Sequence, residues 1–401
     1  MSQLNLKQIA EEVLTEESVK NPGKVCKKLN KIFSKASPEL SFAGSQTDAY
    51  QGHALSPRAA KGCLINDPLR TVKYIQAGYD AIRAAMEKFP ERPIRVLESG
   101  SGPYATLSMT LASLFEQGEV EFMALDIFEE SIKCVYQISK VLGQSEKFPD
   151  LLVGDATTLS LEKLGKKAPH VVLCETMSPG LQVEPQVAIT ANFGDQMVEG
   201  GFFVPEKIDL SVAAAKLFPT RIKELGVIYS LTKEVSQRVK IAGRIDPKLL
   251  EMEQNLDVRM PLPEGLPRVD RLVLQTRLRL FGDRYLEPGE SLITCPLSPF
   301  ISEETRLPRG RIDWVRAKLV LGTAGSDPLK FSVGADSSQG AFPGIADSTD
   351  RSDLSDVTGP VSEVDLINGS CVGNGNWLNF RRFSKKLFEI AQKFIPPGYP
   401  D

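Results

Sequence analysis

Short apolar runs alternate with helix-like stretches between residues 94 and 206, and this alternation constrains the fold more than any other feature of the chain. The runs IRVLESG, VEFMALDI, DLLVGDA and HVVLCET have the length of strands and are largely apolar. The stretches PYATLSMTLASLFEQ, EESIKCVYQISKVLG and AITANFGDQMV have the character of helices. Apolar strands that alternate with helices are typical of a parallel sheet covered on both faces. The sequence therefore predicts an α/β fold, in which GGFFVPEKIDLSVAAA continues as strand.

The segments on either side of this region have different patterns of apolar residues. The chain begins with helical patterns, and residues 66–88 predict one amphipathic helix that starts at Pro68 after a cap at Asn66 or Asp67. Beyond residue 207, the runs RLVLQTRLRLF, SLITCPLSPFI and RIDWVRAKLVLG alternate with a period of two. This period favours an antiparallel β domain.

Four segments follow from these patterns. The pattern of residues 216–255 predicts a partly helical segment, so we expect an arm inserted into the β domain. The stretch after residue 335 is rich in Gly, Ser and Asp, which indicates a long loop before a terminal helix. The predicted segments are an N-terminal helical segment (1–55), an α/β domain (56–207), a β-barrel-like domain with the arm (208–335) and a C-terminal loop and helix (336–401).

The bulk properties exclude several classes of function. The net charge of −3 over 401 residues gives no electrostatic case for binding nucleic acid, and no apolar run is long enough to span a membrane. The six cysteines lie far apart without a CxxC pair, and there are two histidines, so neither a disulfide framework nor a metal site is expected. The first residues lack the apolar core of a signal peptide, and we expect a cytoplasmic protein.

Acidic residues stand at the ends of three successive predicted strands. The first strand ends in ESGSGPY, in which Gly100 and Gly102 permit a tight turn and a close approach of the backbone to a ligand. Glu98 opens this turn, Asp126 closes the second strand and Asp155 closes the third. Asp126 is placed to hold two ribose hydroxyls, and Asp155 to contact an adenine edge. Acids at these positions suit adenosine with a cationic amino-acid tail, and they do not suit a pyrophosphate.

This arrangement resembles the class I S-adenosylmethionine-dependent methyltransferases. The resemblance covers residues 94–210 and implies a Rossmann-like domain that binds S-adenosyl-L-methionine. The third glycine of the family's motif falls at Tyr104 in this chain.

A loop with two glutamates follows the fourth strand. It reads LCETMSPGLQVE, and Glu175 and Glu184 stand at its ends with Pro179 and Gly180 between them. The loop lies at the carboxyl end of a strand, where α/β folds bind their ligands. Two carboxylates that face one cleft can bind a guanidinium, whose N–H groups pair with carboxylates in a fixed geometry. They would draw positive charge toward the nitrogens they hold, the remaining nitrogen would accept a methyl group, and Glu184, or alternatively Glu175, would take the proton.

The two glutamates look like the double-glutamate loop of the protein arginine methyltransferase family. The family has an Asp-x-x-Arg-Thr helix before its first strand, and the stretch DPLRTVKYIQA is similar to it, which implies that Arg70 binds the cofactor's carboxylate. The family's last helix leads into a strand that begins with Gly-Gly, and the stretch MVEGGFFVPEK is similar to this connection. The resemblance covers residues 60–335 and implies a homodimer in which the arm docks on the partner's cofactor domain. It implies catalytic roles for Glu175 and Glu184 and substrate contacts for Glu175, Met177 and Glu184. The implied cofactor-binding residues are Arg70, Glu98, Gly100, Gly102, Asp126, Ile127, Asp155, Ala156 and Glu175.

The sequence departs from this family at two places, and the second bears on the acceptor. Thr176 stands where the family has an aromatic residue before the methionine. The family's Thr-His-Trp loop, which helps to hold the substrate arginine, has no match. Its nearest candidates are Ile312-Asp313-Trp314 and Gln275-Thr276. We therefore expect an N-methyltransferase that acts on the guanidino group of free L-arginine or a small guanidino metabolite. The alternatives are a protein arginine methyltransferase, a methyltransferase of another small metabolite, and a scaffold that keeps the fold without catalysis.

Overall fold

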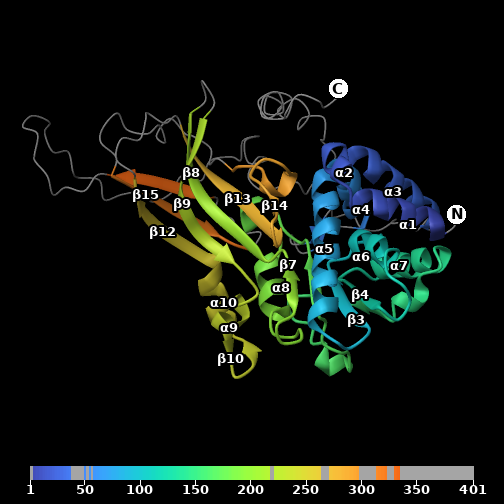
Figure 1. Ribbon diagram of the computed structural model, residues 1–401. Helices are drawn as coiled ribbons and strands as arrows, with labels where there is room; N and C mark the ends of the chain where they lie inside the picture. Colours follow the sequence, from blue (N-terminus) through green and yellow to red (C-terminus); the bar gives the residue numbers. More distant parts are fainter. Residues whose placement is uncertain are drawn as a thin grey trace, which may run out of the picture.

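The chain folds into a parallel sheet with helices on both faces, followed by antiparallel strands that carry a helical arm (Figure 1). Helix α5 (Pro68–Lys88) stands between these two parts and packs on strands of both. The predicted α/β fold with a second, antiparallel part is thereby confirmed. The computed structural model describes residues 3–37, 49–50, 54–55, 57–216, 221–262, 271–297, 313–322 and 329–334.

The parallel sheet has the strand order β5-β4-β3-β6-β7. Its strands are β3 (Ile94–Ser99), β4 (Val120–Asp126), β5 (Asp150–Val153), β6 (Val171–Cys174) and β7 (Phe202–Val204). The chain moves outward from β3 to β5 and then returns to place β6 on the other side of β3, and all four neighbouring pairs are parallel. The strand order therefore reverses between β3 and β6, and sheets of this kind bind ligands outside the carboxyl ends of the strands at such a point.

Both faces of this sheet are buried because successive strand residues point to opposite sides. Val96 and Phe122 belong to the core beneath α5, α6 (Thr106–Ala112) and α7 (Glu129–Val141). Their chain neighbours Leu97 and Met123 belong to a second core on the other face, which α8 (Gln186–Phe193) covers. This explains why the strands read as nearly continuous apolar runs.

The N-terminal helices extend the first of these cores. They are α1 (Gln3–Val13), α2 (Glu16–Lys20) and α3 (Pro22–Ala36), and the buried residues Val25, Leu29 and Phe33 recur along α3 at helical spacing. A short hairpin of β1 (Ala49–Tyr50) and β2 (Ala54–Leu55) follows. Helix α4 (Pro57–Asn66) then precedes α5, which begins at Pro68 after a cap at Asp67, as predicted.

The antiparallel strands of the second part form two larger sheets within the described residues. One has the order β14-β13-β8-β9 and the other the order β12-β15-β16, and among the described residues they do not close into a barrel. The strands are β8 (Lys207–Lys216), β9 (Arg221–Leu231), β12 (Asn255–Pro261), β13 (Arg271–Phe281), β14 (Arg284–Leu286), β15 (Trp314–Val320) and β16 (Lys330–Gly334). The arm consists of α9 (Val235–Val239), β10 (Lys240–Ile241), β11 (Arg244–Ile245) and α10 (Pro247–Gln254), with α9 against α8.

Three local expectations differ from the structure. The run from Gly201 onward is two strands in different sheets, because the chain turns after β7 at Pro205 and Glu206. The run SLITCPLSPFI is not a strand in its described part: it begins as a 3₁₀ helix, Leu292–Thr294, held by a capping box between Ser291 and Thr294. The arm begins later than expected, since β9 occupies its first part. The predicted C-terminal loop and helix lie outside the described residues.

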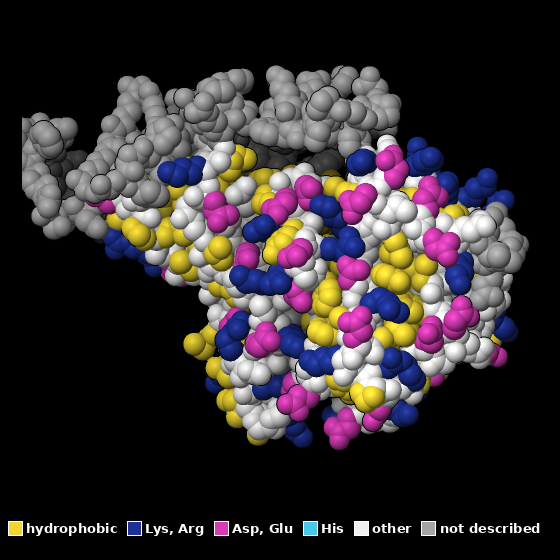
Figure 2. Space-filling view, in the orientation of Figure 1, with side chains coloured by type: hydrophobic (Ala, Val, Ile, Leu, Met, Phe, Trp, Pro, Cys, Tyr) yellow, Lys and Arg dark blue, Asp and Glu magenta, His cyan; other side chains and the backbone are white. Residues whose placement is uncertain are grey.

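On the face shown in Figure 2, Lys and Arg side chains are interspersed with Asp and Glu over the described surface. The described residues contain no helix that is long and apolar enough to cross a membrane. Within the same residues, no group of three or more His, Cys, Asp or Glu side chains is arranged to hold a metal ion.

Candidate active site

One cavity lies at the carboxyl ends of β3, β4 and β6, where the strand order reverses. All residues that the sequence singled out for cofactor or substrate contribute to its lining. They are Arg70, Glu98, Gly100, Gly102, Asp126, Ile127, Asp155, Ala156, Glu175, Met177 and Glu184. The register brings the strand ends together: Ser99 pairs with Leu125 on one side and with Cys174 on the other. The next residues along the chain, Gly100 and Glu175, therefore leave adjacent strands at the same edge.

The turn after β3 depends on its glycines. Gly100 has φ of 74° and Gly102 has φ of 61°, in the left-handed region that favours glycine. The N–H groups of Gly100 and Ser101 both donate to the carbonyl of Leu125, at 2.8 Å and 3.0 Å. A Cβ at position 100 would lie 2.3 Å from Cγ2 of Thr176. The first loop residue after Glu175 thus packs directly on the glycine turn.

The helix after this turn starts later than the sequence suggested. We expected it near Pro103, whereas α6 begins at Thr106 because Ala105 adopts φ of 41° and interrupts helical geometry. Tyr104, which stands at the third glycine of the family motif, is buried against Phe33 with ring centroids 5.6 Å apart. The N-terminal helices therefore accommodate the tyrosine at this position.

Glu98 and Asp126 are buried carboxyl groups that organise the turn. One oxygen of Glu98 accepts a hydrogen bond from the N–H of Ser108 at 2.9 Å, and burial raises the pKa of Glu98 to about 7. The two oxygens of Asp126 accept from the N–H groups of Gly102 and Phe128, at 2.8 Å and 2.9 Å, and burial raises its pKa. A carboxylate oxygen has more than one lone pair, so both oxygens of Asp126 can still accept hydroxyl donors.

The side chain of Asp155 makes local hydrogen bonds at the rim of the cavity. Its Oδ1 accepts from the N–H and the hydroxyl of Thr157, at 2.8 Å and 2.7 Å, and the residue is exposed. It lines the cavity together with its neighbour Ala156, and Ile127 follows Asp126 on the same side.

Arg70 connects α5 to the double-glutamate loop. Its guanidinium donates from Nη1 to Oε1 of Glu175 at 3.0 Å, and its Nε lies 3.7 Å from Oδ2 of Asp67. The arginine side chain is 9% exposed and that of Glu175 is 22% exposed, so this ion pair is largely withdrawn from water and opens on the cavity. Burial raises the pKa of Glu175 to about 7, although the Arg70 guanidinium acts in the opposite direction.

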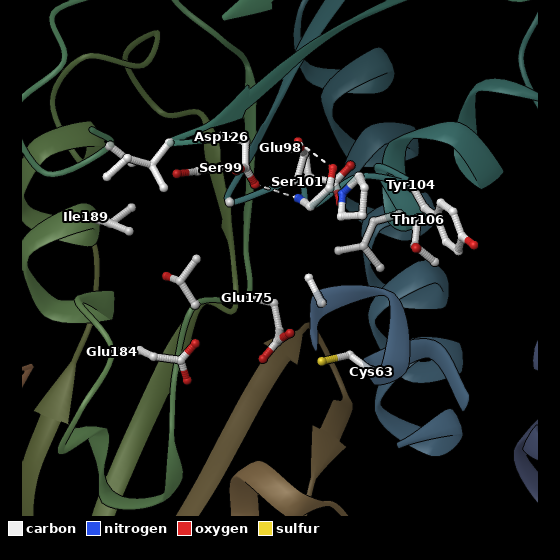
Figure 3. A pocket seen from close by; sticks show the side chains of 18 of the residues that line it. Cys63, Glu98, Ser99, Ser101, Tyr104, Thr106, Asp126, Glu175, Glu184 and Ile189 are labelled. Atoms are coloured by element: carbon white, nitrogen blue, oxygen red, sulfur yellow. Dashed lines mark hydrogen bonds between the residues drawn. The ribbon is translucent and has the colours of Figure 1, made fainter. Parts of the chain in front are cut away.

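Glu184 faces the same cavity as Glu175 and has no hydrogen-bond or ion-pair partner among the described residues. The carboxyl groups of Glu175 and Glu184 point into one open part of the cavity, and the sulfur of Cys63 points into it from the opposite side (Figure 3). Burial, followed by the negative charge of Glu175, raises the pKa of Glu184 to about 8. A carboxylate in this position is stabilised by a cation placed between the two glutamates.

The double-glutamate loop is fixed along its length by hydrogen bonds. The N–H and hydroxyl of Thr176 donate to Oε1 of Gln186, at 3.0 Å and 3.1 Å. The hydroxyl of Ser178 accepts from the N–H of Val183 at 2.9 Å, which closes the turn formed by the 3₁₀ helix Pro179–Leu181. Met177 is 2% exposed and belongs to the main core, while also lining the cavity.

The structure separates the two candidates for the family's Thr-His-Trp loop. Gln275-Thr276 lies beside the loop, because the N–H of Gly180 donates to Oγ1 of Thr276 at 3.0 Å, and Thr276 is fully buried. Trp314 is the first residue of β15 and packs against Arg259. The opposite end of β15 lies near the double-glutamate loop, because the N–H of Gly322 donates to the carbonyl of Leu181. The seven residues of β15 separate Trp314 from this end by roughly 20 Å. Ile312 lies outside the described residues.

Sequence reasoning missed the contribution of α4 and of the middle of α5. Ala60, Cys63 and Leu64 of α4 line the cavity, as does Tyr74 of α5, one turn after Arg70. No motif marks α4 in the sequence. The spacing from Arg70 to Tyr74 is four residues, which places both side chains on one face of the helix, and this spacing was the available signal.

These residues fit a ligand with an adenosine part and a zwitterionic amino-acid part. The left-handed glycine turn lets the backbone approach closely, Asp126 can accept from ribose hydroxyls, and Arg70 supplies a buried cation. The hydroxyl oxygen of Tyr74 is buried without a hydrogen-bond partner among the described residues, as expected beside a site for a polar ligand.

No family model and no curated protein matches this sequence. Among solved structures, the fold is similar to the Trypanosoma brucei PRMT1 enzyme–prozyme heterotetrameric complex with AdoHcy (12% identity over 67% of this chain and 90% of that chain, TM-score 0.43). It is also similar to PRMT6 with SAH (13% identity, 65% and 96%, TM-score 0.44). A third similar structure is Arabidopsis thaliana protein arginine methyltransferase 10 (10% identity, 68% and 92%, TM-score 0.47).

Proposed function

We propose that the chain is an S-adenosyl-L-methionine-dependent N-methyltransferase that acts on the guanidino group of arginine, with free L-arginine or a small guanidino metabolite as acceptor. The observation that carries this proposal is the pair of loop carboxylates, Glu175 and Glu184, which point into one cavity beside the glycine turn. A guanidinium presents N–H groups in a planar fork that matches two carboxylates.

In the proposed reaction, each part of the site has a separate task. S-adenosyl-L-methionine supplies a methyl group on a sulfonium when it is bound. Arg70 would bind the carboxylate of the cofactor's amino-acid part, and Asp126 would accept hydrogen bonds from its ribose. Glu175 and Glu184 hold the guanidinium and draw its positive charge toward the nitrogens that they contact. The remaining nitrogen would then regain a usable lone pair and bond to the methyl carbon as the carbon–sulfur bond breaks, which leaves S-adenosylhomocysteine. Glu184 would accept the proton that the methylated nitrogen loses.

The protonation of the two glutamates supports a cationic acceptor. Without ligand, their pKa values of about 7 and about 8 leave part of the population protonated near neutral pH. An arginine side chain stays protonated at any working pH, and its charge between the carboxyl groups lowers both pKa values. Acceptor binding should therefore release protons, and the affinity for L-arginine should rise between pH 6 and pH 8.

Two features of the chain favour a small acceptor over arginine within a protein. The family loop that carries a histidine toward the substrate has no counterpart in the sequence. The position beside the double-glutamate loop is held by the neutral, fully buried Thr276, which already accepts from Gly180.

The experiment is a methyl-transfer assay with labelled S-adenosyl-L-methionine. L-arginine, agmatine, guanidinoacetate and an Arg/Gly-rich peptide are offered side by side, and L-citrulline serves as a control because a neutral urea replaces the guanidinium. The proposal predicts product from L-arginine or a small guanidine, none from citrulline, and loss of product in Glu184→Gln but not in Glu130→Gln on exposed α7. Product from the peptide alone would identify a protein arginine methyltransferase. Methylation of compounds without a guanidine would refute the arginine assignment.

We also propose that the chain forms a homodimer through its arm. Ile241 and Met252 lie on the arm and are 59% and 71% exposed, so two large apolar side chains face water in the single chain. Burial of such side chains is the usual driving force for association. Sedimentation of the purified chain should give a dimer that Ile241→Glu with Met252→Glu converts to monomer. A monomer before substitution would contradict this.

A further inference from the structure

The proposed function assigns no task to the hydroxyl group of Tyr74, a residue of the cavity wall. Tyr74 is 1% exposed, and its hydroxyl oxygen has no hydrogen-bond partner among the described residues. A buried polar group without a partner destabilises a fold, and native structures hold few of them. A tyrosine rather than a phenylalanine at this position therefore indicates a partner that arrives from outside the chain.

The residues around this hydroxyl indicate which kind of ligand group it can bind. Tyr74 lies one turn beyond Arg70 on the same face of α5, and both residues line the cavity. The groups that act electrostatically on the hydroxyl include the charged side chains of Glu175, Arg70 and Asp67. Burial and the nearby negative charge of Glu175 raise the pKa of Tyr74 well above its ordinary value, so the phenol stays protonated and is a hydrogen-bond donor.

A hydrogen-bond acceptor of the ligand, placed beside Arg70, would give the hydroxyl of Tyr74 its missing partner. The ligand group that Arg70 attracts carries negative charge, and a carboxylate has enough lone pairs to accept from the guanidinium and from a phenol together. The adenosine end of the proposed cofactor is assigned to Asp126 and Asp155 at the ends of β4 and β5, whereas Tyr74 belongs to α5, where Arg70 also stands.

We propose that Tyr74 is a cofactor-binding residue whose hydroxyl donates a hydrogen bond to the carboxylate of the cofactor's amino-acid part, next to Arg70. This inference rests on the proposed function, because it requires a cofactor with an amino-acid part. It assigns to α5 two donors, a guanidinium and a phenol, for one carboxylate.

The test compares two ligands in calorimetry with the full chain. S-adenosylhomocysteine carries the amino-acid part, and 5′-methylthioadenosine lacks it. For Tyr74→Phe, the dissociation constant for S-adenosylhomocysteine should rise about tenfold or more, while that for 5′-methylthioadenosine stays unchanged, because a hydrogen bond to a charged group is lost for one ligand alone. Tyr79→Phe, on the same helix and packed on Phe115, is the matched control and should leave both constants unchanged.

A second measurement needs no ligand. Removing a buried hydroxyl that lacks a partner should leave the urea midpoint of the ligand-free Tyr74→Phe protein equal to or above that of the unsubstituted protein. A lowered midpoint would mean that the hydroxyl has a structural partner, and equal losses for both ligands, or no loss, would each overturn the inference. If the unsubstituted protein binds 5′-methylthioadenosine and S-adenosylhomocysteine equally well, Tyr74 has no carboxylate to bind, while the methyltransferase proposal stands. If it binds neither, the proposed function itself fails.

Discussion

Replacing Glu184 by glutamine should stabilise the ligand-free protein at high pH, although it removes a residue that the proposed reaction requires. The pKa of Glu184 is raised from 4.5 to about 8, first by burial and then by the charge of Glu175. Between these values the folded protein holds a proton that the unfolded chain has lost. The free energy of unfolding therefore falls as pH rises through this window, and it is highest below it.

The size of the effect follows from these two pKa values. At 1.36 kcal/mol per pH unit, the interval from 4.5 to about 8 sets a ceiling of about 5 kcal/mol on the cost of ionising Glu184 in the folded state. The side chain opens on the cavity, where water reduces this cost, so we expect about 2 kcal/mol. Glutamine has nearly the same shape and no charge, and the gain in Glu184→Gln should reach this value above pH 8.5.

Urea unfolding of the ligand-free protein at several pH values between 4.2 and 9 measures this gain. The advantage of Glu184→Gln should grow with pH and fall to within ~0.5 kcal/mol at pH 4.2, where Glu184 is largely protonated in the unfolded chain as well as in the folded protein. Glu130→Gln, on the exposed surface of α7, serves as control and should follow the unsubstituted protein. A Glu184→Gln protein that is less stable at pH 9, or equally changed at both ends of the range, would refute the inference that this carboxylate is held in the cavity without a partner.

Three further substitutions test other parts of the site. Arg70→Met should weaken binding of S-adenosylhomocysteine at least tenfold in calorimetry, because a buried cation is lost; unchanged affinity would exclude Arg70 from the cofactor site. Gly100→Ala should lower the free energy of unfolding by about 1–3 kcal/mol, since the new Cβ has a left-handed φ and meets Thr176, and Thr176→Ala in the same chain should restore part of it. Thr276→Val should leave the N–H of Gly180 without an acceptor, cost about 1–3 kcal/mol in urea unfolding and raise KM for the acceptor; an unchanged KM would show that the loop does not depend on this bond.

The sequence was sufficient for the parts of the site that follow strand ends. Apolar runs predict parallel strands, parallel strands align their carboxyl ends, and residues after those ends must meet. Glu98, Asp126 and Glu175 were placed together on this basis, and they line one cavity in the structure. The start of α5 could also be predicted from the sequence, because proline is favoured in the first turn of a helix.

The features that sequence reasoning missed depend on tertiary contacts. Helix α4 carries Gly62 in its middle and contains no recognised motif, so nothing in the sequence marks Cys63 as a cavity residue. Tyr74 reads as a buried aromatic residue on an amphipathic helix, and its unpartnered hydroxyl is visible in three dimensions alone. The late start of α6 follows from the left-handed conformation of Ala105, which residue preferences disfavour.

The position of the double-glutamate loop relative to the β domain also required the structure. The residues Ile312-Asp313-Trp314 are closest in type to the family's histidine loop, yet Trp314 packs on Arg259 at the remote end of β15. Thr276 contacts the loop because β13 runs beneath it, and this pairing joins residues almost a hundred positions apart in the sequence. Local patterns carry no information on such a distant contact.

The central claim is that Glu175 and Glu184 hold a guanidinium beside the methyl donor, and the most direct test is to locate the transferred methyl group. The protein is incubated with L-arginine and S-adenosyl-L-methionine labelled with ¹³C in its methyl group, and the product is examined by NMR. We predict a single class of labelled methyl attached to a guanidino nitrogen, absent with Glu184→Gln and with L-citrulline. A labelled methyl on the α-amino or carboxylate group, or label that never leaves the cofactor for any guanidine, would contradict the account.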